Sequence, residues 1–150
     1  LAISDALLTE ALGDGYDKNM DQLLRGVDLE DFASIPFILN LPQNRTQNII
    51  DQYLRNHNIT LHSIIRNDDH YCGAILASQN VGAYIGPQTM LNFMLQHYQN
   101  TWRDKLYLFP IRGLEKSLTL CLVHHSNVYM PEFLTVFCHM VKETLINMCK

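Results

Sequence analysis

The sequence predicts an α/β fold in which helices cover both faces of a mostly parallel sheet. Segments with the pattern of strands alternate with segments of helical periodicity from residue 36 to residue 111, in three successive strand–helix units and a closing strand. Pro36 suits the first position of a strand because it cannot donate to a ladder. The three consecutive apolar residues after it, Phe37, Ile38 and Leu39, are typical of a strand buried on both faces.

The residues before this strand are predicted to form shorter elements. Residues 1–4 are apolar and are expected to form a strand, and residues 5–12 have helical periodicity. The run Gly13-Asp14-Gly15 ends that helix. A second short helix is expected at residues 17–25, and a helical turn at residues 28–32 leads into the buried strand.

The three strand–helix units account for most of the remaining chain. Asn44 is a plausible N-cap for the first helix, and Asn67 or Asp68 for the second. Each crossover between parallel strands should be right-handed. The helices are expected at residues 45–57, 69–78 and 89–99, and the strands at 36–41, 59–65, 81–85 and 105–111.

The C-terminal part departs from the alternation. A strand predicted at residues 117–125 follows with no intervening helix, so it must run antiparallel to its neighbour or leave the sheet. The last helix is expected from Pro131 to about Met148. His139 and Glu143 are four residues apart on it and can form a surface pair.

Composition and charge exclude several classes of function. The net charge is −4 and the 11 lysines and arginines are scattered, so this chain has no positive stripe for nucleic-acid phosphates. No apolar run approaches the roughly 18 residues of a membrane span. Four separated cysteines without a Cys-x-x-Cys pair indicate a reducing compartment. The chain begins without methionine or a signal peptide, and we expect it to be part of a longer protein.

No catalytic or metal-binding motif is found, so we expect neither an enzyme nor a bound metal or cofactor. The acidic run from Asp14 to Asp21 is similar to a calcium loop but lacks the glycine required at its sixth position. The adjacent His124 and His125 would point to opposite faces of a strand. His70 and Cys72, two residues apart on a helix, also face away from each other.

Ligands of open parallel sheets bind beyond the carboxyl ends of the strands. Three connections reach that edge here, at residues 40–44, 66–70 and 86–89. Each leads into a helix whose first N–H groups are available to a ligand. The second connection carries Asp68 and Asp69, which can satisfy the helix dipole themselves and would repel an anion.

An ordered set of sequence landmarks resembles one family. The run from Gly26 to Leu39 resembles the C-terminal effector-binding part of LysR-type transcriptional regulators. Asn80 occupies the first glycine position of the family's Gly-x-Gly turn, and asparagine tolerates the left-handed conformation required there. The other landmarks are Arg45 with Ile50-Asp51, the segment Ile75–Pro87, the segment Leu106–Ile111, Leu118–His124 and Tyr129–Phe137.

The resemblance implies a periplasmic-binding-protein-like fold and a ligand-sensing function. Residues 1–125 would form effector-binding subdomain II with the crossover strands, and residues 126–150 a helix of subdomain I. The DNA-binding domain is absent, so DNA would be bound only through the missing N-terminal part. The resemblance also implies a cytoplasmic homo-oligomer, a dimer or tetramer at full length, without membrane contact. The expected effector-binding residues are Ser4, Asn40, Asn67, Asp68 and Pro87.

Two alternatives remain from the sequence. A periplasmic-type solute-binding protein shares the fold but would need a signal peptide upstream, and free thiols suit its compartment poorly. An α/β enzyme is the third class, and no catalytic constellation supports it.

Overall fold

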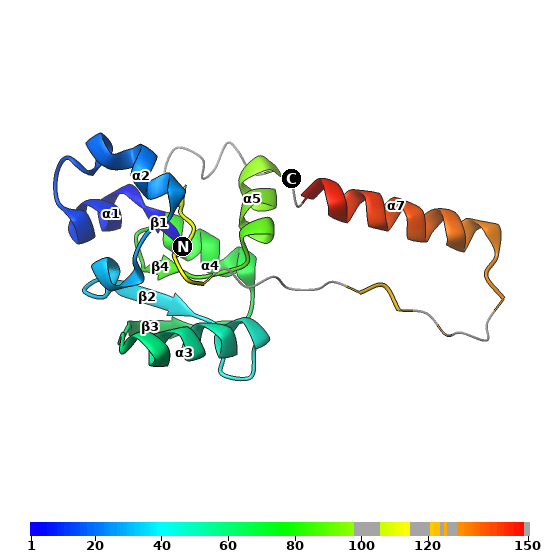
Figure 1. Cartoon of the computed structure of the whole chain (residues 1–150), viewed down its shortest axis with the longest axis horizontal. Helices are drawn as coiled ribbons and strands as arrows, with labels where there is room; N and C mark the ends of the chain where they lie inside the picture. Colours follow the sequence, from blue (N-terminus) through cyan, green and yellow to red (C-terminus); the bar gives the residue numbers. More distant parts are fainter. Residues whose placement is uncertain (98–105, 115–120, 124, 126–128, 149–150) are drawn as a thin grey trace. The chain divides into compact units, whose positions relative to one another are not determined.

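The computed structural model describes residues 1–97, 106–114, 121–123, 125 and 129–148 (Figure 1). The chain divides into two compact units, Leu1–Lys116 and Ser117–Lys150. The first unit contains the sheet and the helices that pack on it, and all candidate site residues lie in it.

The sheet of the first unit has five strands in the order β3-β2-β4-β1-β5. Strand β2 (Pro36–Leu39) pairs in parallel with β3 (His62–Arg66) on one side and with β4 (Ala83–Tyr84) on the other. Strand β1 (Ala2–Ser4) is antiparallel to both β4 and β5 (Leu106–Leu108). Four strands therefore point one way, and β1 alone among the described strands runs against them.

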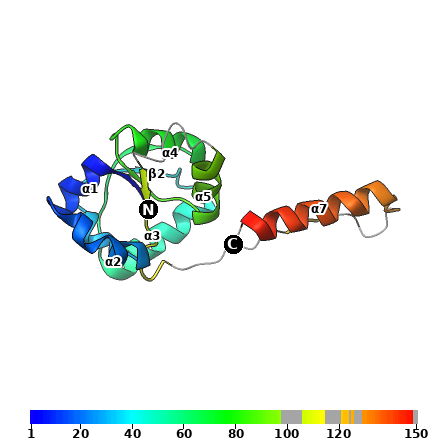
Figure 2. The same cartoon turned by 90° about the horizontal axis from the view of Figure 1, so that it is seen from above.

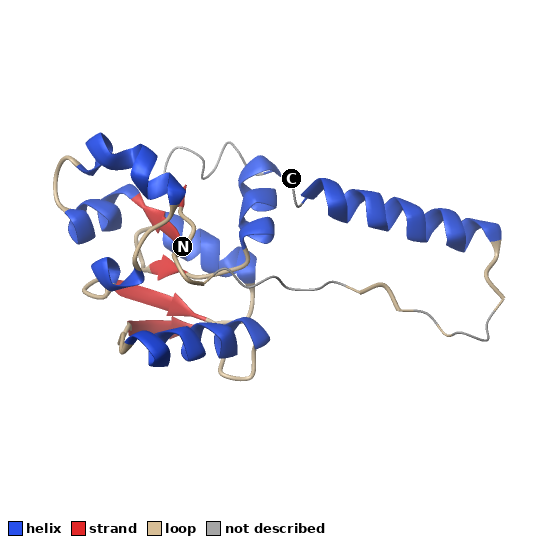
Figure 3. Ribbon diagram, viewed as in Figure 1, coloured by secondary structure: helices blue, strands red, loops and turns tan. Residues whose placement is uncertain are grey.

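Helices cover both faces of the sheet, as predicted. Figure 2 shows α1 (Asp5–Leu12), α2 (Met20–Arg25) and α3 (Arg45–His57) on one side of the strands, with α4 (His70–Ser78) and α5 (Gln88–His97) on the other. The 3-10 helices η1 (Tyr16–Asn19) and η2 (Leu29–Phe32) connect the N-terminal elements on the α1 side. Figure 3 distinguishes the helices from the strands of this arrangement by colour.

Strand β2 is buried on both faces because its alternating side chains belong to two different cores. Phe37 and Leu39 pack with α1 and α3, and Ile38 packs with α4 and α5. Phe37 and Ile38 are 0% exposed and Leu39 is 2% exposed. The prediction of a doubly covered strand is therefore confirmed.

Local capping signals decide where the helices begin and end. Asn44 caps α3 as predicted, since its side chain accepts a hydrogen bond from Thr46 N at 2.8 Å. Asn80 has φ +63°, so it takes the left-handed turn expected at that position. The predicted cap of α4 is wrong: the cap is Asp69, which accepts from Tyr71 N and Cys72 N.

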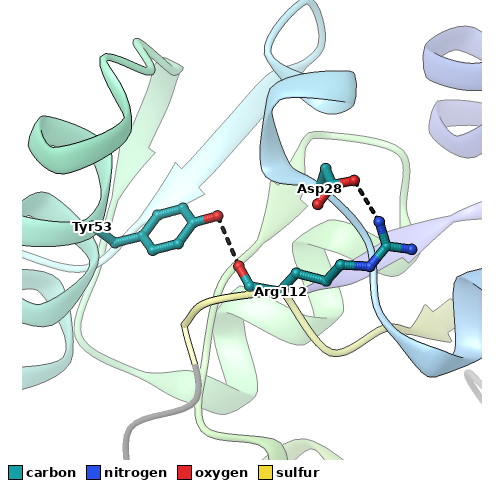
Figure 4. A network of polar contacts seen from close by, with 3 residues as sticks. All are labelled: Asp28, Tyr53 and Arg112. Atoms are coloured by element: carbon teal, nitrogen blue, oxygen red, sulfur yellow. Dashed lines mark hydrogen bonds and ion pairs between the residues drawn. The ribbon is translucent and has the colours of Figure 1, made fainter.

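A polar network holds the segment that follows β5 against the α1 and α3 side of the sheet (Figure 4). Tyr53 on α3 donates its hydroxyl proton to the Arg112 carbonyl oxygen at 2.8 Å. The Arg112 guanidinium contacts the Asp28 carboxylate at 2.5 Å, and Val27 pairs with Ile111 in a parallel bridge. The two chain segments, 26–28 and 110–112, are thereby fixed side by side.

Tyr53→Phe is expected to lower the free energy of unfolding by about 0.5–1.5 kcal/mol, because one hydrogen bond to the backbone is lost while the ring stays packed. Asp28→Asn is the matched comparison and should cost no more than about 1 kcal/mol, since both members of that ion pair are about half exposed. Urea unfolding of the chain measures both. A larger loss for Asp28→Asn than for Tyr53→Phe would contradict this ranking.

The second unit contains helix α7 (Glu132–Met148). His139 and Glu143 form the expected surface pair, with Nε2 and Oε1 3.8 Å apart and both side chains mostly exposed. The predicted strand at 117–125 falls mainly outside the described residues, and residues 121–123 belong to neither a helix nor a strand. No helix of the described ranges combines the length and hydropathy of a membrane span.

Candidate functional site

The carboxyl ends of the parallel strands gather three connections at one edge of the sheet. In register, Ile38 of β2 lies beside Tyr84 of β4, and Leu39 lies beside Arg66 of β3. The residues that follow each strand are therefore neighbours: Asn40 after β2, Asn67 after β3 and Ile85 after β4. The pairing continues beyond β3, where Asn67 N donates to the Leu39 carbonyl at 3.0 Å.

Asn40 is the centre of this edge and is completely buried. Its backbone N–H donates to Gln47 Oε1 at 2.9 Å, and its carbonyl accepts from the Arg66 guanidinium at 3.1 Å. Its side-chain Nδ2 donates to the Ile85 carbonyl at 3.3 Å, and its Oδ1 accepts from the Tyr84 hydroxyl at 3.0 Å. Asn40 thus links the ends of three strands to α3.

The side chain of Tyr84 in β4 extends to the same edge of the sheet, and a glycine lies close to its ring on each side. A Cβ on Gly73 of α4 would lie 2.7 Å from its ring, and a Cβ on Gly86 would lie 2.6 Å from it. The ring is fully buried. Its hydroxyl reaches Asn40 and also lies 2.5 Å from Nδ1 of His70, the first residue of α4. Burial raises the pKa of Tyr84, so the hydroxyl keeps its proton.

The connection after β3 is fixed by its own carboxylates and amide. Asp68 Oδ1 accepts from Leu41 N at 3.0 Å and from Asn44 Nδ2 at 3.1 Å, which ties this connection to the one after β2. Asn67 Oδ1 accepts from Asp69 N at 2.5 Å. The Asn67 Nδ2 atom is buried without a hydrogen-bond partner, the one such side-chain atom in the described part of the chain. A buried donor left unsatisfied costs about 1–3 kcal/mol.

The structure brings together four of the five residues expected from the sequence. Asn40, Asn67 and Asp68 lie at the carboxyl edge, and Pro87, which is partly exposed, precedes α5 at the same edge. Ser4 does not join them. It ends β1, which runs antiparallel, and it lies beside Leu106 at the start of β5.

Ser4 therefore lies near the amino ends of the parallel strands, roughly 13 Å along the strand direction from the level of Asn40. Its hydroxyl accepts from Leu7 N at 3.4 Å as the N-cap of α1, and it is 2% exposed. The direction of β1 could not be derived from its apolar pattern. A central strand that is buried on both faces is a continuous apolar run, whether it runs parallel or antiparallel to its neighbours.

Three further polar residues of the edge were not among the expected effector-binding residues, although one of them, His70, ends a connection that the sequence placed there. His70 is the first residue of α4, Tyr84 lies in β4 and Gln47 lies in α3. In the sequence, nothing distinguishes these three from residues that only support a helix or a strand. Gln47 is 0% exposed and its Nε2 donates to Asp51 at 2.6 Å, so both ends of the amide are used. A polar side chain on the inner face of an amphipathic helix was the signal available in the sequence.

His70 should make the stability of the chain fall as the pH is lowered. Burial lowers the pKa of its imidazole below the ordinary value of 6.5, against the opposing effect of Asp69 and Asp68. The unfolded chain therefore binds the proton first, and stability decreases as the pH falls below about 6.5. His70→Asn should flatten this dependence in urea unfolding between pH 5 and pH 8. An unchanged slope would show that the imidazole has no role in it.

The donor set at this edge does not include a metal site. No group of three or more histidine, cysteine, aspartate or glutamate side chains within the described ranges could hold an ion. The described cysteines, Cys72, Cys121 and Cys138, are free thiols. What the edge offers to a ligand is hydrogen bonding, with the partly exposed imidazole of His70 among its polar side chains.

Comparison with known proteins identifies the fold. No family model and no curated protein matches the chain. Among solved structures, the effector-binding domain of QuiR in complex with shikimate matches with a TM-score of 0.54 and 16% sequence identity. The match covers 92% of this chain and 56% of that one, so the chain spans little more than half of the QuiR domain. Over the matched part, the chain shares the α/β fold of that domain, which is the periplasmic-binding-protein-like fold that the sequence resemblance predicted.

Proposed function

We propose that the chain is part of the ligand-sensing domain of a LysR-type transcriptional regulator. The observation that carries this proposal is the fold shared over 92% of the chain with an effector-binding domain that holds shikimate. The sequence landmarks between Gly26 and Phe137 support the same family independently. The protein would act as a cytoplasmic homo-oligomer that binds DNA through a domain outside this chain.

The effector would bind at the carboxyl edge of the sheet, in a cleft completed by the other subdomain. Residues 1–125 would supply subdomain II and the crossover strands, and residues 126–150 the helix returning to subdomain I. Asn67 and Pro87 are proposed to contact the effector, with Asn40 and Asp68 holding the connections in place. We propose no effector contact for Ser4, because it lies beside Leu106, away from this edge.

Effector binding would regulate transcription by favouring one arrangement of the oligomer over another. A ligand shifts such an equilibrium only by the difference between its affinities for the two states. A cleft between two subdomains gives that difference, because the ligand contacts both walls only when the cleft is closed. No chemical step is required of the residues at the edge.

The test uses the full-length protein and DNA carrying its own promoter. Purified protein is screened by thermal shift against small polar metabolites, including shikimate, and each compound that raises the melting temperature is tested for a change in promoter binding. The expected result is one compound that does both. Failure of the full-length protein to bind its promoter would exclude a regulator, and a signal peptide in place of a DNA-binding domain would indicate a solute-binding protein.

A further inference from the structure

The hydrogen-bond chain Asn40–Tyr84–His70 fixes which imidazole nitrogen of His70 carries the proton. Asn40 Nδ2 donates to the Ile85 carbonyl, so the amide orientation is determined and Oδ1 faces the Tyr84 hydroxyl. The Asn40 side chain is 0% exposed, so its Oδ1 needs a hydrogen-bond donor from the protein, and the Tyr84 hydroxyl is that donor. Tyr84 has one proton, and it is therefore committed to Asn40.

The Tyr84 oxygen must then accept from His70 rather than donate to it. Nδ1 of His70 lies 2.5 Å from that oxygen and is the donor of the pair. In the neutral imidazole one nitrogen is a donor and the other an acceptor, so Nε2 carries a lone pair. Nε2 has no hydrogen-bond partner among the described residues, and the side chain of His70 is partly exposed at the ligand edge.

The surroundings of His70 favour a ligand group that donates a hydrogen bond. Asp68 and Asp69 precede it on the same connection, and their carboxylates disfavour an approaching anion there. Both the imidazole and the carboxylates accept hydrogen bonds from neutral donors. A ligand hydroxyl, which can donate its proton to Nε2, matches this environment.

We propose that His70 is a specificity-determining residue of the effector site, accepting a hydrogen bond at Nε2 from a hydroxyl group of the effector. This inference rests on the proposed function and specifies its ligand class: small hydroxylated molecules, with the hydroxyl rather than an anionic group over the start of α4. Tyr84 and Asn40 act behind it as positioning residues that hold the tautomer.

The test uses full-length protein labelled with ¹⁵N-histidine. The probes are shikimate, quinate and 3,4-dihydroxybenzoate, each paired with the analogue that lacks its hydroxyls. Without ligand, the His70 resonances should show the Nδ1–H tautomer at pH 8. A hydroxylated probe should shift the Nε2 resonance, and its deoxy analogue should bind more weakly and leave that resonance in place.

Two variants of His70 distinguish the role of Nε2 in ligand binding from the role of Nδ1. His70→Asn keeps a group that can meet Tyr84 and removes the Nε2 acceptor, so it should weaken the hydroxylated probe about five- to tenfold, the loss of one neutral hydrogen bond. His70→Gln can place an oxygen near the Nε2 position and should restore part of the affinity. The affinity of the deoxy analogue should be the same in all three proteins.

The outcomes distinguish the two proposals. Binding of a hydroxylated probe with an unmoved Nε2 resonance, or an Nε2–H tautomer in the free protein, overturns the role of His70 and leaves the proposed function standing. If no probe binds and none changes promoter binding, the ligand class is wrong, while the wider metabolite screen still decides the regulator. Should either variant fail to fold, the resonances of the unmodified protein give the answer.

Discussion

Gly73→Ala is expected to lower the free energy of unfolding by about 1–3 kcal/mol. Helix propensity alone predicts the opposite change in stability, because alanine inside a helix is about 0.5–1 kcal/mol more stabilising than glycine. A Cβ at this position would meet the Tyr84 ring at 2.7 Å. The ring cannot turn away, because its hydroxyl is held by Asn40 and His70 and Gly86 lies against its other edge. Urea unfolding of the chain measures the loss.

A double variant attributes the loss to this contact. In a Tyr84→Leu background the ring is gone, so adding Gly73→Ala should cost much less than it does in the unmodified chain. Cys72→Ala, an exposed position on the same helix, should stay within about 0.5 kcal/mol of the unmodified chain. Equal costs for Gly73→Ala in the two backgrounds would contradict the proposed clash.

Asn40→Ala is expected to cost about 2–4 kcal/mol of unfolding free energy. The change leaves the buried Ile85 carbonyl without a donor, which costs about 1–3 kcal/mol, and it also removes the hydrogen bond from the Tyr84 hydroxyl to Asn40, worth about 0.5–1.5 kcal/mol. The backbone bonds of residue 40 to Gln47 and Arg66 remain. Urea unfolding at pH 8 gives the value without a contribution from protonation of His70.

The same variant has a second, independent readout. Once Asn40 Oδ1 is absent, the Tyr84 proton is free to turn toward His70 Nδ1, so the imidazole should move toward the Nε2–H tautomer. Gln43→Ala, in the exposed part of the same loop, should change neither the stability beyond about 0.5 kcal/mol nor the tautomer. A stable Asn40→Ala chain with the original tautomer would show that the network does not control His70.

The helices of the first unit were predictable because their signals are local. The predicted range of α3, residues 45–57, is the observed one, and α1 also has its predicted bounds. Capping by Asn44 and the left-handed Asn80 depend only on neighbouring residues. The cap of α4 was placed one or two residues early, since three polar residues in succession can each cap a helix and only the backbone path selects Asp69.

The strands and the site depended on more distant contacts. Strand β3 begins at His62 rather than residue 59, and β4 includes only Ala83 and Tyr84, because a strand exists only where a partner lies beside it. Ser4 was grouped with the ligand edge only because of the family resemblance, and its apolar strand carries no local signal of its direction. Pairing with β4 and β5 reverses it and moves Ser4 toward the opposite edge.

The sequence by itself determined the α/β alternation, the doubly buried strand and the three connections at which polar residues would gather. These follow from apolar periodicity and turn chemistry, which act over a few residues. Only the tertiary structure decided the strand order, the direction of β1 and the contacts of Tyr84 with its partners His70 and Asn40, which lie 14 and 44 residues from it in the chain. No local pattern carries the information that packing brings them within hydrogen-bond distance.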